Sequence, residues 1–253
     1  MWAAKSVSGV ALPFTASASL DRFGSSTTLR AWTVVTFVKT VLSLPFMKPR
    51  IPVSPSASPR RLDLRFLKLS SFWVLQTGNI IQGFGYFLPS TYLPSYSTTT
   101  VPMGTMLIAL FSGTSIFGGI VIGWLCDRFA INNVLLFSSV GSALSVFLFW
   151  GLASAGQSSP NTALTLLTLF SVSYGFFAGG FSSTWSGVIT HIKRDSSSSS
   201  MDTGFVFGLL AGGRGVGNVL GSVGAARAHE ATGYGTRYGT LIIFTGVTAL
   251  FGA

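Results

Sequence analysis

The chain has 253 residues, of which 48% are hydrophobic and only 9% are charged, and its mean hydropathy is +0.59. Soluble domains carry about 25% charged residues, so this composition excludes an ordinary soluble protein and predicts an integral membrane protein. The formal net charge is +10. Six cations lie in one segment with a single acid, Asp63: Lys48, Arg50, Arg60, Arg61, Arg65 and Lys68. We interpret this segment as a cytoplasmic loop, because Lys and Arg accumulate on that side of a membrane. A lipid- or partner-binding role is the alternative, and no nucleic-acid partner is expected.

Eight apolar segments follow one another along the chain. The first two, Ala3–Leu20 and Arg30–Met47, are weak, because one is rich in Ser and the other holds Lys39 near its middle. A signal peptide is the alternative for the first, although no convincing cleavage site follows it. About 20 apolar residues cross a bilayer, and the last of the six stronger segments is short by this measure. The stronger segments are Leu69–Leu93, Pro102–Leu125, Ile131–Ala153, Thr162–Thr190, Gly204–Ala226 and Tyr238–Ala253.

Charged residues alternate with uncharged connections between these segments. Placing the basic loop in the cytoplasm also places Asp127, Arg128 and the Lys193-Arg194 pair there. Asp127 and Arg128 follow a membrane segment directly. We expect them to act as a conformational latch, in which Asp127 caps a neighbouring helix and Arg128 pairs with an acid.

A polar stripe runs along the segment Leu69–Leu93. Gln76, Asn79, Gln82 and Tyr86 are spaced by three, three and four residues, which places them on one face of a helix. Polar side chains inside a membrane face protein or water rather than lipid. The stripe therefore predicts either a substrate pathway or hydrogen bonds that hold two helices together.

Arg214 is the single charge in Gly204–Ala226. A charge at that depth costs about 3 kcal/mol on insertion scales, so it is expected to face a partner, a wet cavity or a substrate. Asn218 lies one turn later on the same face. Arg214 would bind an anionic substrate or, alternatively, bond the backbone carbonyls of a neighbouring helix. Two ridges of glycine would allow close packing on both sides of this helix: Gly204, Gly208 and Gly212, and Gly213, Gly217 and Gly221.

The sequence lacks the combinations of residues that enzyme catalysis needs. None of the six acids lies in the middle of a predicted span, and the two histidines, His191 and His229, fall near the ends of spans. No metal-ligand motif occurs in the sequence. We therefore expect a protein that is not an enzyme and that uses no cofactor.

Several motifs together resemble one family. Phe66–Tyr96 resembles the seventh span of fungal monocarboxylate-transporter-like proteins of the major facilitator superfamily. Gly123–Phe129 is similar to the second copy of that superfamily's cytoplasmic loop signature, and Ala211–Gly221 is similar to the eleventh span. Leu20–Gly24 resembles the end of the fifth span. Gly119 departs from the pattern, because similar members often carry an arginine at that position.

The resemblance implies an α-helical transporter with two six-helix bundles that works by alternating access. On this map the chain starts at the fifth span and ends within the twelfth. Residues 1–47 would be a remnant of the N-terminal bundle, 48–68 a basic cytoplasmic linker, and 69–253 the C-terminal six-span bundle with an incomplete last span.

The functional expectation is transport of a small organic solute, such as a monocarboxylate or a related anion, by symport with a proton or by uniport. The plasma membrane is the expected location, with an internal membrane as the alternative. The competing hypothesis is a non-transporting truncated protein, or a half-transporter fragment that needs a missing N-terminal half or a second copy as its partner.

Overall fold

The computed structural model describes residues 2–46, 64–100, 103–154, 159–195, 202–231 and 239–252. Regular secondary structure within these ranges is helical throughout, and no strand occurs in them. The chain separates into two compact units, one of residues 12–62 and one of residues 1–11 with 63–253. Most of the predicted basic linker lies outside the described residues, so the predicted domain boundaries stay predictions.

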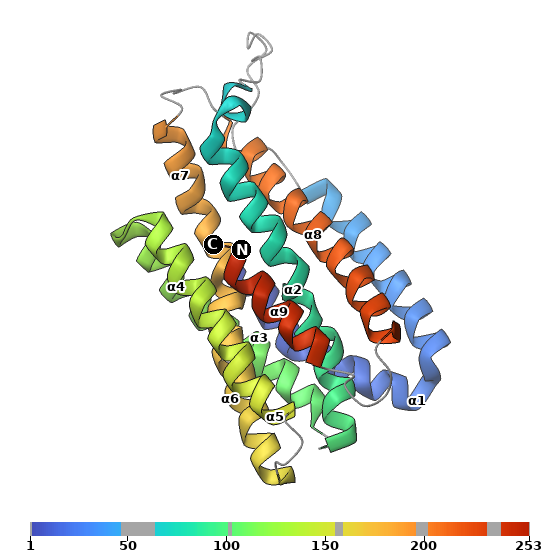
Figure 1. Cartoon of the computed structure of the whole chain (residues 1–253). Helices are drawn as coiled ribbons and strands as arrows, with labels where there is room; N and C mark the ends of the chain where they lie inside the picture. Colours follow the sequence, from blue (N-terminus) through green and yellow to red (C-terminus); the bar gives the residue numbers. More distant parts are fainter. Residues whose placement is uncertain are drawn as a thin grey trace. The chain divides into compact units, whose positions relative to one another are not determined.

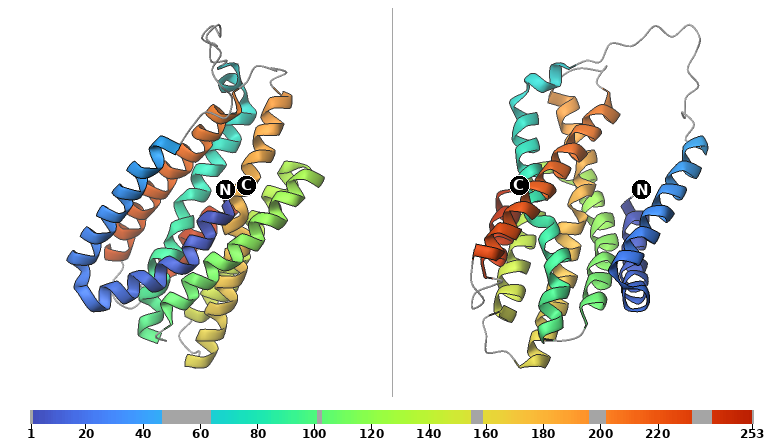
Figure 2. Two further views of the ribbon diagram at one scale, coloured as in Figure 1. Left: turned by 180° about the vertical axis from the view of Figure 1, so that it is seen from behind. Right: turned by 90° about the vertical axis from the view of Figure 1, so that its right-hand side faces the viewer.

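The smaller unit contains most of helix α1 (Trp2–Ser43) and the short 3₁₀ turn η1 (Leu44–Phe46). The two weak segments of the sequence form one element, which bends at Gly24 between them (Figure 2). Gly24 has φ 73° and ψ 169°, a conformation that only glycine adopts easily. The Thr28 hydroxyl donates to the Ser19 carbonyl across this bend, at 3.0 Å.

The larger unit consists of the remaining helices (Figure 1). In chain order they are η2 (Arg65–Lys68), α2 (Ser70–Thr100), α3 (Gly104–Arg128), α4 (Ile131–Leu144), η3 (Ser145–Trp150), α5 (Gly151–Ser154), α6 (Pro160–Gly180), η4 (Phe181–Thr184), α7 (Trp185–Asp195), α8 (Thr203–Ala231) and α9 (Gly239–Phe251). Each of the six stronger predicted segments corresponds to one helical rod, because α4, η3 and α5 are continuous, as are α6, η4 and α7.

Five helical stretches are long and apolar enough to cross a membrane: Gly9–Phe46, Gly104–Arg128, Ile131–Ser154, Asn161–Asp195 and Thr203–Ala225. The all-α membrane fold expected from the sequence is therefore confirmed. Helix α2 is not among the five, and its polar stripe and its Ser and Thr residues account for that. Helix α9 is apolar but shorter, as its sequence predicted.

Glycine lets the rods approach one another closely. In α3 a Cβ added at Gly118 would overlap the Phe176 backbone of α6, and a Cβ at Gly175 would overlap the Phe111 backbone in return. Close backbone contact of this kind is a common way for membrane helices to associate. Bulky side chains fill the space to either side, including Trp150, Phe170 and Tyr174, which are almost completely buried.

Two rods contain local changes of helical winding. Residues Ser145–Trp150 form a π-helix, and Phe181–Thr184 form a 3₁₀ turn between α6 and α7. The sequence predicted one long helix over Thr162–Thr190. Gly179 and Gly180, followed by two serines and a threonine, provide the physical reason for the change, since glycine in a helix interior is unfavourable.

The charged ends of the rods gather at one end of the larger unit (Figure 1). Ser71 at the start of α2 donates a hydrogen bond to Asp195 at the end of α7. Arg128 at the end of α3 and Arg194 line a common hollow. This arrangement agrees with the prediction that the three charged connections share one side of the membrane.

Candidate functional site

The contact between α2 and α8 holds the predicted site residues. Gly83 of α2 faces Gly217 of α8, and a Cβ added at Gly83 would lie 3.0 Å from the Arg214 carbonyl and 3.4 Å from the Gly217 Cα. A Cβ at Gly217 would overlap the Ile80 carbonyl, and one at Gly221 would overlap the Phe84 backbone. The ridge of Gly213, Gly217 and Gly221 therefore packs as predicted.

The second predicted ridge does not pack in this way. Gly204, Gly208 and Gly212 are exposed, and no atom of the described residues lies within 4 Å of a Cβ added at Gly208 or Gly212. Close packing on this face is not seen among the described residues. Glycine permits a close approach, and the side chains of a facing helix must favour it.

Two amides of the polar stripe bond to α8 directly. The Gln76 Nε2 donates to the Leu209 carbonyl at 3.0 Å, and the Asn79 Nδ2 donates to the Leu210 carbonyl at 2.7 Å. The Trp185 indole nitrogen donates to the Asn79 Oδ1 at 3.3 Å. Asn79 therefore connects α2, α7 and α8, and both amides hold helices together, which is the second of the two roles that the sequence left open.

Arg214 lies among aromatic rings. Its guanidinium carbon is 4.3 Å from the ring centre of Tyr86, 5.3 Å from that of Phe181 and 6.0 Å from that of Trp185. The residue is only 5% exposed. Cation–π contacts contribute about 2 kcal/mol or more when the cation is desolvated, so the rings stabilise the charge in part.

The two terminal nitrogens of Arg214 have no hydrogen-bond partner among the described residues. These nitrogens therefore do not bond backbone carbonyls of a neighbour, which was the structural alternative for this residue. A buried cation without an anion or an acceptor is costly. The arrangement can accept an anion, because five N–H donors of a guanidinium form a planar fork that matches a carboxylate.

The other predicted pathway residues lie on the same contact. Gln82 is 3% exposed, and its Oε1 and the Asn218 Oδ1 are buried without a partner within the described part of the chain. Tyr86 is half-buried and stacks beneath Arg214. A cavity of about 30 Å³, which has room for about one water, lies beside Asn79 and Trp185.

Asp127 and Arg128 are exposed at the end of α3. Arg128 lies over the ring of Trp124, with 5.2 Å between its guanidinium carbon and the ring centre. The structure does not bring them to Arg214. The latch remains a prediction.

Phe181 and Trp185 complete the site, and the sequence argument missed both. The 3₁₀ turn η4 changes the winding just before Trp185 and so helps aim both rings at Arg214. The signal was present in the glycine pair at 179–180 and in the serines that follow, since these residues weaken a helix inside an apolar run.

No group of three or more His, Cys, Asp or Glu side chains that could hold a metal is found in the described ranges. What the geometry offers is a buried cation, aromatic surface and three buried amide oxygens without a partner among the described residues, those of Gln76, Gln82 and Asn218.

Comparison with known proteins identifies the family. The chain is 26% identical over 207 residues to the MFS-type transporter pynF of Aspergillus niger, covering 80% of this chain and 45% of that protein. It is 24% identical over 254 residues to MFS-type transporter 1 of an Ophiocordyceps species, covering 99% and 53% respectively. It is also 28% identical over 129 residues to the aspyridones efflux protein apdF of Emericella nidulans, covering 50% and 25%. Together these relatives, each covering much of the chain or a part of it, support a protein of the major facilitator superfamily.

No family model and no solved structure matches this major facilitator chain. The chain spans about half the length of the first two relatives. All three relatives are named as transporters or efflux proteins, which agrees with the expectation that the protein is not an enzyme. None of the three names specifies a monocarboxylate, so that narrower assignment stays a prediction.

Proposed function

We propose that this protein takes part in transport of a small organic anion across a membrane, and that Arg214 binds the anion's negative charge. The observation that carries the proposal is a buried arginine whose two terminal nitrogens have no hydrogen-bond partner in the part of the chain that the structure describes. A charged group inside a membrane segment seldom persists without a function, because it is costly to insert.

The surroundings of Arg214 define the kind of anion. Tyr86, Phe181 and Trp185 offer aromatic faces close to the guanidinium. A carboxylate with an apolar body would place its charge on the guanidinium fork and its body against these rings. Gln82 and Asn218 would line the path, while Gln76 and Asn79 would fix the helices that carry it.

The direction of transport that one comparison favours is export. The observation in its favour is that a relative is named as an efflux protein. The names of the relatives also favour a transporter over the non-transporting alternative. A proton as the coupled ion and the plasma membrane as the location follow from the family resemblance and are part of the proposal. A partner chain or a second copy of this chain within the transporting assembly is also part of the proposal.

A binding measurement tests the Arg214 assignment without requiring translocation. Trp185 lies 6.0 Å from the Arg214 guanidinium, so an anion bound there should change its fluorescence. We would titrate the purified full chain in detergent with a panel of carboxylates and an uncharged amide analogue of each. Saturable quenching by a carboxylate, absent for its amide and absent in Trp185→Phe, is the expected result.

Two variants separate binding from folding. Arg214→Gln should weaken carboxylate binding at least tenfold, because a charge-assisted hydrogen bond contributes about 1.5–3 kcal/mol. Arg227→Gln removes the same charge from the exposed end of α8 and is the matched control. Equal affinity of the two variants would overturn the role of Arg214. Radiolabelled uptake or export in transporter-null cells, with surface abundance measured, would then test transport itself.

A further inference from the structure

A polar hollow lies at the end of the rods, and Arg214 is not among its lining residues. It has a volume of about 600 Å³ and is lined by the end of α3, the start of α4 and the outer part of α7. Arg128, Arg194 and His191 contribute to its wall, and Asp127 is the one acid among its lining residues. We call it the headgroup pocket. Its arginines outnumber its acid, so it is complementary to an anion.

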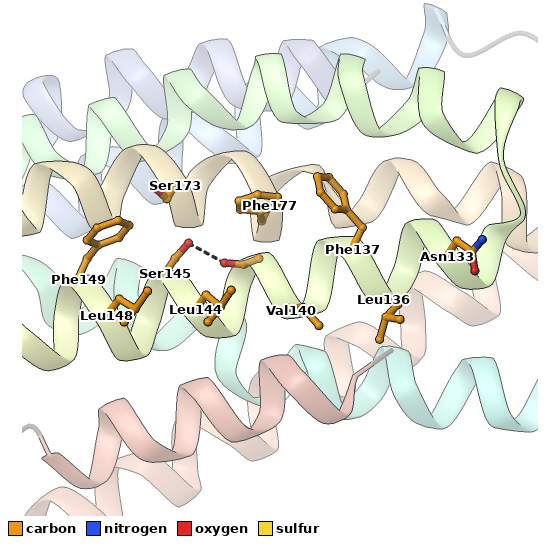
Figure 3. A pocket seen from close by; sticks show the side chains of 11 residues that line it. Asn133, Leu136, Phe137, Val140, Leu144, Ser145, Leu148, Phe149, Ser173 and Phe177 are labelled. Carbon is orange, nitrogen blue, oxygen red and sulfur yellow. Dashed lines mark hydrogen bonds between the residues drawn. The ribbon is translucent and has the colours of Figure 1, made fainter.

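A separate, apolar groove also reaches the first turn of α4. The groove has a volume of about 590 Å³ and runs along α4 and η3, with part of α6 opposite (Figure 3). Figure 3 shows Asn133 at one end of it and Phe149 at the other, with Ser173 and Phe177 of α6 alongside. We call it the α4 groove. Asn132 lines the headgroup pocket and Asn133 lines the α4 groove, so the two hollows both reach the first turn of α4.

The surroundings indicate that a lipid, rather than a soluble anion, fits both hollows. Trp124 and Phe129 are 53% and 56% exposed beside the headgroup pocket, and exposed aromatic residues gather at membrane interfaces. Leu136 and Leu144 are about half exposed along the groove, on a rod that is long and apolar enough to cross a membrane. Residues 133–148 extend about 22 Å at 1.5 Å per residue, somewhat more than the ~15 Å of one leaflet's hydrocarbon.

We propose that these two hollows form a binding site for one anionic phospholipid, with its phosphate-bearing headgroup near Arg128 and Arg194 and one acyl chain in the α4 groove. Basic pockets between membrane helices on the cytoplasmic side bind anionic headgroups by this chemistry. The site does not involve Arg214, so it stands independently of the transported solute.

Native mass spectrometry of the delipidated full chain tests the proposal. The probes are phosphatidylserine and phosphatidylcholine with identical acyl chains, and water-soluble glycerophosphoserine. We expect the chain to retain phosphatidylserine at least tenfold better than phosphatidylcholine. Arg128→Gln with Arg194→Gln should remove this preference, because each arginine at an anionic surface contributes about fivefold in affinity.

The controls decide between a site and general charge attraction. Arg22→Gln with Arg30→Gln removes two exposed positive charges from α1, and this pair should keep the preference. Arg128→Lys with Arg194→Lys keeps the charge, so it should keep most of the preference and tests for misfolding. A preference that survives in the pocket glutamine pair, or that falls equally in both glutamine pairs, would overturn the proposal.

Two further outcomes test the lipid and its chain. Glycerophosphoserine that displaces phosphatidylserine at equal concentration would mean a soluble-anion site and would also overturn the lipid assignment. Leu144→Trp places bulk in the α4 groove and should reduce phosphatidylserine retention several-fold. Unchanged retention in that variant would contradict the placement of the acyl chain.

Discussion

Helix α8 carries the same small-residue pattern on two faces, and among the described residues of the larger unit only one of them packs against another helix. Gly213, Gly217 and Gly221 bring α8 onto α2 until backbone meets backbone. Around Gly208 and Gly212 there is open space as far as the described residues extend. The packed face also has polar partners across the contact, since two amides of α2 bond to α8 carbonyls. A glycine ridge thus permits a close approach, while side-chain hydrogen bonds select which ridge is used.

The largest expected effect on stability comes from substitutions on the packed face of α8. Gly217→Ala with Gly221→Ala would drive two methyl groups into the α2 backbone and should lower the free energy of unfolding by roughly 2–6 kcal/mol, since overpacking costs about 1–3 kcal/mol per site. Thermal unfolding of the purified chain measures it. The matched pair Gly208→Ala with Gly212→Ala should keep or raise stability, by up to about 2 kcal/mol, because alanine is the better helix former and space is open there. An equal loss in both pairs would contradict the comparison.

A second change removes the buried charge on the packed face. Arg214→Met should raise the free energy of unfolding by about 1–4 kcal/mol without ligand, because an apolar side chain replaces a buried charge that lacks a hydrogen-bonding anion. The same variant should lose the carboxylate-dependent quenching of Trp185. Thermal unfolding with and without the carboxylate checks both effects. A destabilised Arg214→Met would indicate that the arginine serves mainly to hold the fold.

A third change tests the amide that links three helices. Asn79→Ala removes the hydrogen-bond partner of the Leu210 carbonyl and of the Trp185 indole. It should lower the free energy of unfolding by about 1–3 kcal/mol, the usual cost of leaving a buried polar group unsatisfied. It should also alter the emission of Trp185. Unchanged stability together with unchanged emission would show that Asn79 does not position that ring.

The smallest expected effect concerns Gln76. Its Nε2 bonds the Leu209 carbonyl near the start of the contact. Gln76→Leu should cost about 0.6 kcal/mol, the average for an inter-helix hydrogen bond in a membrane protein. Chemical or thermal unfolding of both variants, Gln76→Leu and Asn79→Ala, ranks the two amides by the stability that each contributes. A larger loss for Gln76→Leu than for Asn79→Ala would reverse the ranking that the hydrogen bonds predict.

Much of this contact could be predicted from the sequence. The spacing of Gln76, Asn79 and Gln82 places them on one helical face, and all three are buried. Arg214 was expected to be buried on a membrane helix because no other charge accompanies it, and it is 5% exposed. Helical periodicity depends on local sequence, so arguments of this kind work without knowledge of the neighbours.

The features of the contact that the sequence did not predict depend on neighbouring helices, which helical periodicity does not specify. The packed and open ridges of α8 have the same composition, so only the facing helix distinguishes them. Phe181 and Trp185 reach Arg214 from another rod, through a change of winding that hydropathy does not register. The bend of α1 at Gly24 likewise depends on the backbone torsions of a single residue, which the hydropathy pattern does not register.

The winding of the four residues of η4 sets how far α7 is rotated about its axis relative to α6. A 3₁₀ turn advances about 2.0 Å and 120° per residue, whereas an α-helix advances 1.5 Å and 100°. Rewinding Phe181–Thr184 into α-helix would therefore turn α7 by roughly 80° about its axis and shorten the rod by about 2 Å. Trp185 begins α7, so this rotation would carry its ring away from the Arg214 guanidinium and release the indole from Asn79. A local change in winding would then open one wall of the anion site without any helix leaving the bundle.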